Sequence, residues 1–142
     1  MLYLLDANVL IAMAWPNHPF HAHARTWFLQ HAATGWATCG LTEIAFIRLS
    51  ANPIVVGQAP RPPEAWRLLR DFRRYGAHQF LSDDQLDNGR WERVLNRCIG
   101  HKQVNDAWLV ALAGSHGVTL VTYDRPIQVL AEQPADVLVL MV

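Results

Sequence analysis

Four acidic residues each follow a predicted strand or open a predicted helix. They are Asp6, Glu43, Asp106 and Asp124. Asp6 directly follows the apolar run 2–5, and Asp124 follows the apolar run 118–122. Because the carboxyl ends of parallel strands gather at one edge of a sheet, acids placed there can share a site. We therefore expect all four side chains to face one cleft.

The chemistry of such a cluster follows from charge repulsion. Two carboxylates about 5 Å apart at an effective dielectric near 20 repel by roughly 3 kcal/mol, so four cannot all stay ionised without a cation or a proton. Glu43 and Asp106 are predicted in first helical turns, where the helix dipole favours the ionised form by about 0.3 to 1 kcal/mol. Oxygen ligands without Cys or His suit a hard ion, Mg²⁺ or Mn²⁺. Such an ion can polarise a phosphodiester, orient an attacking water and stabilise the leaving oxygen. The implied reaction is phosphodiester hydrolysis.

Each acidic residue, taken alone, also has a purely structural interpretation. A single acidic residue near a helix start is most often a cap or a dipole partner, so neither Glu43 nor Asp106 is informative alone. The signal is the recurrence of acids after successive strands. Many folds that transfer phosphoryl groups place carboxylates in this way.

The elements that must position these residues alternate between strands and helices. The predicted strands are 2–5, 35–39, 79–81, 118–122 and 137–142. The predicted helices are 9–15, 18–33, 41–49, 64–75, 87–97 and 104–116, with a short helix opened by Pro126. This alternation predicts an α/β fold with a mainly parallel sheet and helices on both faces.

Composition narrows the class of protein. A chain of 142 residues suits one domain, 1–142, and its 12 basic and 12 acidic residues cancel, so net charge does not indicate a partner. Cys39 and Cys98 form neither a disulfide framework nor a zinc motif. The sequence shows no leader and no apolar run of membrane-spanning length, so we expect a cytoplasmic protein with no membrane association.

Four short motifs, taken together, resemble those of a known family. They are Leu4-Leu5-Asp6-Ala7-Asn8-Val9-Leu10, Leu41-Thr42-Glu43, Val104-Asn105-Asp106-Ala107-Trp108-Leu109 and Leu120-Val121-Thr122-Tyr123-Asp124-Arg125. In this order and at these separations they resemble the successive motifs of PIN-domain VapC-type toxins of type II toxin–antitoxin systems. The resemblance covers nearly the whole chain. It implies a three-layer α/β/α sandwich, a Mg²⁺-dependent endoribonuclease and a cognate VapB-type antitoxin that blocks the acidic cleft.

The resemblance also implies roles for individual residues. Asp6 and Asp106 would be the principal metal ligands, and Asp124 a further ligand that often acts through water. Glu43 would be a ligand or would position the attacking water. Three polar residues would orient these acids through hydrogen bonds, namely Asn8, Thr42 and Thr122.

The function expected from these observations is a toxin that cuts RNA with Mg²⁺, or with Mn²⁺ as a substitute. We expect a homodimer that also assembles with its antitoxin into a hetero-oligomer. One alternative is a nucleic-acid-binding PIN module with a silenced cleft. Another is a small-molecule phosphohydrolase with Asp6 as nucleophile, which is weakened because Asp6-Ala7-Asn8 lacks the second Asp found two residues on in proteins that resemble haloacid dehalogenases.

Several other polar and aromatic residues are given the simpler interpretation or no role. We expect a solvated helix start for His18, His21 and His23, and a solvated helix face for Arg67, Arg70, Arg73 and Arg74. The tryptophans at helix positions, Trp27, Trp66, Trp91 and Trp108, are predicted to lie in the core or in a protein interface. Asp83, Asp84 and Asp87 are held as reserve metal ligands, and His101 is expected to be structural.

Overall fold

A five-stranded parallel sheet lies at the centre of the computed structural model, which describes residues 1–142. The strands are β1 (Tyr3–Leu5), β2 (Trp36–Cys39), β3 (His78–Leu81), β4 (Thr119–Thr122) and β5 (Val137–Val139). Their order in the sheet is β3-β2-β1-β4-β5, so β1 is the central strand. All residues of β2 and β4 are buried, as expected for short apolar strands covered on both faces.

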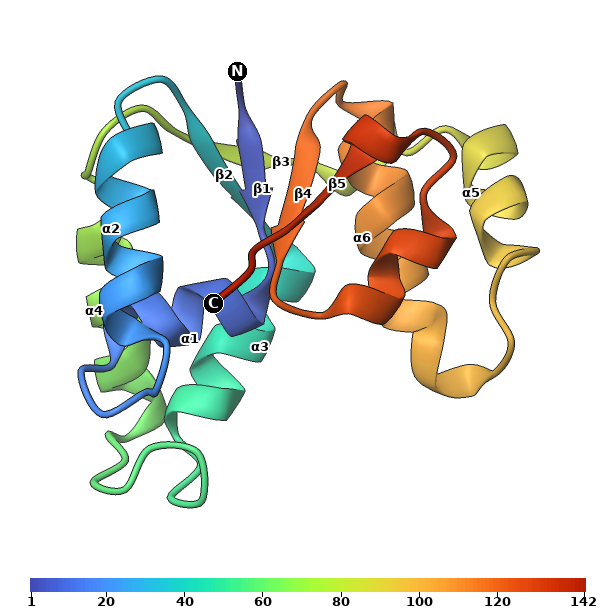
Figure 1. Ribbon diagram of the computed structural model, residues 1–142. Helices are drawn as coiled ribbons and strands as arrows, with labels where there is room; N and C mark the ends of the chain where they lie inside the picture. The colour runs from blue at the N-terminus through green and yellow to red at the C-terminus, as the bar shows by residue number, and fades with distance from the viewer.

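Six α-helices and four short 3₁₀ helices connect the strands. The α-helices are α1 (Ala7–Ala14), α2 (His21–His31), α3 (Gly40–Ser50), α4 (Pro62–Phe72), α5 (Asn88–Leu95) and α6 (Val104–Ser115). The 3₁₀ helices are η1 (Asp83–Gln85), η2 (His101–Gln103), η3 (Arg125–Leu130) and η4 (Pro134–Asp136). The helices α1 to α4 lie to one side of the sheet and α5 and α6 to the other (Figure 1). None of these helices is long and apolar enough to cross a membrane.

Two hydrophobic cores result, one on each face of the sheet. Successive residues of a strand point to opposite faces, and β1 follows this rule. Leu4 packs in the core formed with α5 and α6, whereas Leu5 packs in the core formed with α1 to α4. The expected three-layer α/β/α sandwich is therefore confirmed.

The predicted elements agree with the structure except at some ends. The last strand was expected over 137–142, but β5 ends at Val139. Leu140 still donates a backbone hydrogen bond to Thr122, the last residue of β4. Beyond that point the chain has no strand residue to pair with, so the strand stops. The short helix expected after Pro126 is the 3₁₀ helix η3.

Candidate active site

Asp6 lies at the carboxyl end of the central strand and caps the following helix. Its Oδ1 accepts a hydrogen bond of 2.7 Å from the backbone N–H of Ala7, and its Oδ2 accepts one of 2.8 Å from the Thr122 hydroxyl. The Asp6 backbone N–H donates to Val121 of β4 at 2.9 Å. With 8% of its surface exposed, the side chain is held from both neighbouring segments and has little freedom to turn.

Thr122 connects three parts of the site. While its hydroxyl donates to Asp6, the same oxygen accepts hydrogen bonds from the Asn8 amide at 3.1 Å and from the backbone N–H of Asp124 at 3.0 Å. The Asn8 side-chain oxygen in turn accepts from the backbone N–H of Tyr123 at 3.2 Å. Asn8 and Thr122 thus fix Asp6 relative to the chain that carries Asp124.

Asp106 lies in the first turn of α6 and lines the same cavity as Asp6. Burial, and then the charges of Asp6 and Asp124, raise the pKa of Asp106 to about 6. Burial also raises the pKa of Asp6; hydrogen bonds from Thr122 and Ala7 oppose this rise and the Asp124 charge adds to it. No cationic side chain forms an ion pair with any of these three carboxylates. The site is therefore a group of acids that repel one another.

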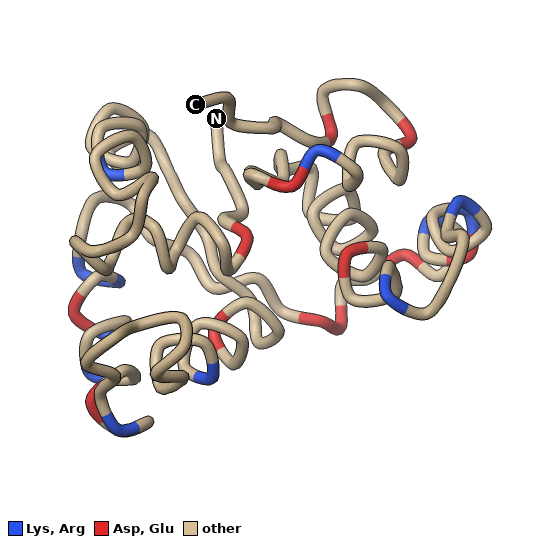
Figure 2. The backbone as a smooth tube through the Cα atoms, turned by 60° about the horizontal axis from the view of Figure 1, so that its bottom comes forward, with Lys and Arg blue, Asp and Glu red and all other residues tan.

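The cavity at this site has a volume of about 160 Å³. Besides Asp6 and Asp106, its polar lining consists of Thr42, Arg48 and Asn105. Figure 2 shows acidic positions on several separate segments that converge toward the middle of the molecule, whereas basic positions lie mainly on outer helices. The cavity is thus an acidic opening with one basic residue, Arg48, in its lining.

Glu43 lies elsewhere. Its Oε2 accepts a hydrogen bond of 2.5 Å from the Thr38 hydroxyl, and its Oε1 lies 3.4 Å from Nη1 of Arg73. His78 Nε2 lies 2.8 Å from the same Thr38 hydroxyl. These contacts face α4 and β3, and Glu43 does not line the acidic cavity. We call Thr38, Glu43, Arg73 and His78 the Glu43 cluster.

The expectation that all four acids face one cleft therefore fails at Glu43. Asp124 does not line the cavity either, although its charge acts on both Asp6 and Asp106. The face of α3 toward the cavity carries Leu41, Ala45 and Arg48, which follow helical spacing. A helix turns by about 100° per residue, so Glu43 lies about 200° from Leu41 and points to the opposite side. Helical spacing alone predicts this opposition once Leu41 is known to face the cavity.

Comparison with known proteins decides the family. The family model described as PIN domain matches residues 3–133 of this chain. The chain belongs to the PIN domain family.

Two relatives come from Mycobacterium tuberculosis. The sequence is 44% identical to Ribonuclease VapC38 over 92% of this chain and 90% of that protein. It is 40% identical to Ribonuclease VapC39, over 87% of this chain and 89% of that protein.

Solved structures agree on the fold. The crystal structure of M. tuberculosis VapC20, a Sarcin-Ricin loop cleaving toxin, superposes with a TM-score of 0.64 at 13% identity, over 93% of this chain and 97% of that one. The VapBC2 structure from Rickettsia felis, bound to a DNA fragment from their promoter, gives a TM-score of 0.58 at 17% identity, over 87% of this chain and 88% of that one. The resemblance seen in the sequence motifs is confirmed.

The remaining predicted residues of this PIN domain have structural contacts. Thr42 lines the cavity, but its hydroxyl bonds to the backbone N–H and C=O of Cys39 and caps α3, and it forms no hydrogen bond with Asp6 or Asp106. Asp87 caps α5 by accepting from Gly89, and Asp84 contacts Ser82. None of the three reserve acids, Asp83, Asp84 and Asp87, lines the cavity.

The histidines and basic residues are divided between surface and core contacts. His21 Nδ1 lies 2.9 Å from the Ala12 carbonyl oxygen, and His23 Nδ1 lies 2.8 Å from the Tyr123 hydroxyl. Among the arginines expected on a solvated face, Arg73 instead pairs with Glu43 and stacks on Trp66. Arg48 and Asn105 of the cavity lining were given no role from the sequence, although the i to i+7 spacing from Leu41 to Arg48 was visible there.

The donor set of the PIN domain site fits a hard cation. Asp6 and Asp106 offer only carboxylate oxygens to the cavity, and neither forms an ion pair with a basic side chain. No three His, Cys, Asp or Glu side chains lie close enough together to form a full ligand set. Mg²⁺ does not require one, because it keeps several waters and commonly binds through one or two carboxylates. Asp6 and Asp106, with Asp124 nearby, therefore suit Mg²⁺.

Proposed function

We propose that this PIN domain is the toxin of a type II toxin–antitoxin pair, an endoribonuclease that hydrolyses RNA phosphodiester bonds with Mg²⁺, or Mn²⁺ in its place. The observation that carries the proposal is the shared cavity of Asp6 and Asp106, whose pKa values are both raised by burial and by the charge of Asp124. Two relatives of the chain are ribonucleases by name, VapC38 and VapC39, which supports the same activity.

In this proposal each residue has a defined task. Asp6 and Asp106 would hold the ion, and Asp124 would contribute to it indirectly. A bound Mg²⁺ would supply charge neutralisation at the scissile phosphate and activation of a water. Thr122 and Asn8 hold Asp6 in one orientation through the hydrogen bonds described above. Glu43 stabilises the start of α3 through Thr38 and Arg73.

The partner is inferred from two of the solved structures that resemble this chain. Two of the structural neighbours are VapBC structures bound to DNA, from R. felis and from Salmonella typhimurium. We propose a VapB-type antitoxin that covers the acidic cavity, a homodimer of this chain, and a hetero-oligomer of the two proteins. An enzyme that acts on cellular RNA would work in the cytoplasm.

The decisive experiment is RNA cleavage by the purified protein. Total RNA is incubated with the protein in Mg²⁺ or in EDTA, and the new ends are mapped. We expect discrete cuts in Mg²⁺ only, and none with Asp6→Asn or Asp106→Asn. Asp84→Asn, an exposed acid outside the cavity, is the matched control and should cut like the wild type. Binding of RNA without cutting would identify a silenced module instead, and unchanged cutting by Asp106→Asn would refute the site.

A further inference from the structure

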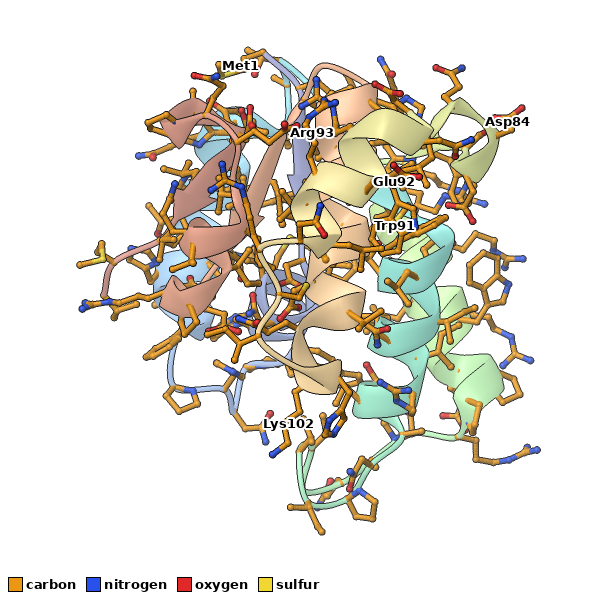
Figure 3. The ribbon with its side chains drawn as sticks, turned by 90° about the vertical axis from the view of Figure 1, so that its right-hand side faces the viewer. Met1, Asp84, Trp91, Glu92, Arg93 and Lys102 are labelled. Atoms are coloured by element: carbon orange, nitrogen blue, oxygen red, sulfur yellow. The ribbon has the colours of Figure 1, made fainter.

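A second hollow adjoins the acidic cavity and has no role in the proposed chemistry. We call it the tryptophan recess, because Trp91 of α5 and Trp108 of α6 form part of its wall. Its volume is about 400 Å³, within the range of roughly 300 to 1,000 Å³ typical of small-ligand sites. Figure 3 shows Trp91 on α5 on the side of the molecule where α5, α6 and α3 come together.

The two indole rings stand edge to face. Their centroids are 5.2 Å apart and their planes meet at 80°. Both side chains are only partly buried, so ring surface remains open to the recess. Flat aromatic surface of this kind stacks readily on an unpaired base, because every base presents a π-face.

Polar groups stand at the edge of this aromatic wall. The exposed Asp83 carboxylate and the exposed Asn105 amide both line the recess. Asp83 takes part in no ion pair and its carboxylate accepts no side-chain hydrogen bond. The recess therefore offers an unoccupied hydrogen-bond acceptor beside a stacking surface, which is the combination used to recognise the edge of a base.

The tryptophan recess is continuous with the acidic cavity. Leu41, Ile44 and Asn105 line both hollows. A nucleotide whose phosphate lies at Asp6 and Asp106 can thus place a neighbouring base in the recess without crossing a wall of protein. Arg48, in the lining of the acidic cavity, has no ion pair and is free to contact the backbone phosphate of the same strand.

We infer that the tryptophan recess binds an unpaired guanine base of the RNA next to the scissile phosphate, and so contributes to the choice of cleavage site. This inference rests on the proposed ribonuclease function. Guanine suits Asp83 because its Watson–Crick edge presents two adjacent N–H donors, which one carboxylate can accept together. An apolar side chain of a protein partner would fill the recess less well, because it would leave the Asp83 carboxylate covered and unpaired.

The first test compares RNA substrates around a mapped cut. Each nucleotide flanking the cut is replaced in turn by an abasic nucleotide, and kcat/KM is measured for the wild type and for Trp108→Leu. We expect one flanking position at which the abasic change lowers wild-type kcat/KM by about 5- to 150-fold, the worth of one stacked base. With Trp108→Leu the intact substrate should lose a similar factor, and the further abasic penalty at that position should vanish.

The second test uses Asp83→Asn, a change at an exposed position that leaves the hydrophobic core untouched. Replacing guanine by inosine removes one N–H donor and should lower wild-type kcat/KM by about 10-fold. The inosine penalty should disappear in Asp83→Asn. Trp66→Leu is the aromatic control, since Trp66 lies on α4 outside the recess, and it should keep both penalties at wild-type size.

The outcomes separate this inference from the proposed function. If the wild type cuts RNA but the abasic and inosine penalties are the same in all variants, the guanine site is refuted while the ribonuclease stands. If Trp108→Leu weakens only antitoxin binding and leaves RNA kinetics unchanged, the recess is a protein site and the inference is wrong. If the wild type cuts no RNA, the proposed function itself fails.

Discussion

Asp106 and Glu43 occupy the same kind of position, the first turn of a helix on the sheet's carboxyl edge, yet their surroundings are opposite. The charges of Asp6 and Asp124 add to the effect of burial in raising the pKa of Asp106, and no basic side chain pairs with it. Glu43 is paired with Arg73 and accepts a hydrogen bond from Thr38. An acid whose charge is balanced within the fold contributes to stability, whereas an acid left unbalanced is available to a ligand. The acidic cavity thus keeps unpaired negative charge, whereas the Glu43 cluster balances its own.

The largest expected effect is on RNA cleavage. Asp106→Asn should lower the cleavage rate by at least about 100-fold, because it removes one of the two carboxylates proposed to hold the Mg²⁺ that neutralises the scissile phosphate. Glu43→Gln should change the rate by less than about 10-fold while lowering the free energy of unfolding by about 1 to 2 kcal/mol, through loss of the Arg73 pair. Cleavage kinetics and urea denaturation measure the two effects. Loss of cleavage in a fully folded Glu43→Gln protein would restore Glu43 to the active site.

A smaller effect is expected at Thr122. Thr122→Val keeps the shape of the side chain but removes the hydroxyl that donates to Asp6 and accepts from Asn8. We expect cleavage to fall by about 10- to 100-fold, the usual cost of losing a residue that orients a metal ligand. Thr119→Val, at the other end of β4, removes a hydroxyl that bonds only to Ala135 and serves as control. Equal activity of the two variants would contradict the orienting role.

Stabilisation of the protein by Mg²⁺ should depend on the acidic cavity and not on the Glu43 cluster. At a concentration tenfold above its dissociation constant, Mg²⁺ should raise the free energy of unfolding by about 1.4 kcal/mol in the wild type and in Glu43→Gln. Asp106→Asn should lose this gain. Thermal unfolding with and without Mg²⁺ measures it, and an undiminished gain in Asp106→Asn would place the ion elsewhere.

The smallest expected effect is on the pH dependence of stability, to which the Glu43 cluster and the acidic cavity contribute with opposite sign. Burial, with the charge of Arg73, lowers the pKa of His78 from 6.5 to about 4. As pH falls from 6.5 toward 4, the unfolded chain takes up this proton before the folded protein does, so stability from His78 is lost. In the same range Asp106, with its pKa raised to about 6, becomes protonated in the fold and repulsion in the acidic cavity is relieved.

Variants separate these two contributions. In EDTA, His78→Gln should lose about 1 kcal/mol less stability than the wild type between pH 7 and pH 4.5, after allowance for the partial exposure of His78. His101→Gln, at an exposed position, should follow the wild type. Urea denaturation at both pH values measures the difference, and identical pH slopes for wild type and His78→Gln would disprove it.

Most of the fold could be predicted because its signals are local. Short apolar runs indicated the buried strands, and Gly117, with a φ of 69°, follows the end of α6 as expected of a helix C-terminus. Asp6 and Asp124 follow central strands directly, so their place at the sheet edge needed only the strand order. The end of the last strand could not be predicted, because it depends on where β4 stops rather than on its own residues.

The sequence by itself determined the strand–helix alternation, the PIN domain motifs, the place of Asp6 and Asp124 after strands and that of Asp106 in a first helical turn. Only the tertiary structure decided how α3 is rotated about its own axis, and therefore which of its residues face the cavity. That helix has apolar residues on several sides, among them Leu41, Ile44 and Phe46, so no single face is marked for the sheet. Its docking sends Glu43 to Arg73, brings Arg48 to the cavity, and joins the cavity to the tryptophan recess. The physical reason is that rotation about a helix axis is set by packing against its neighbours.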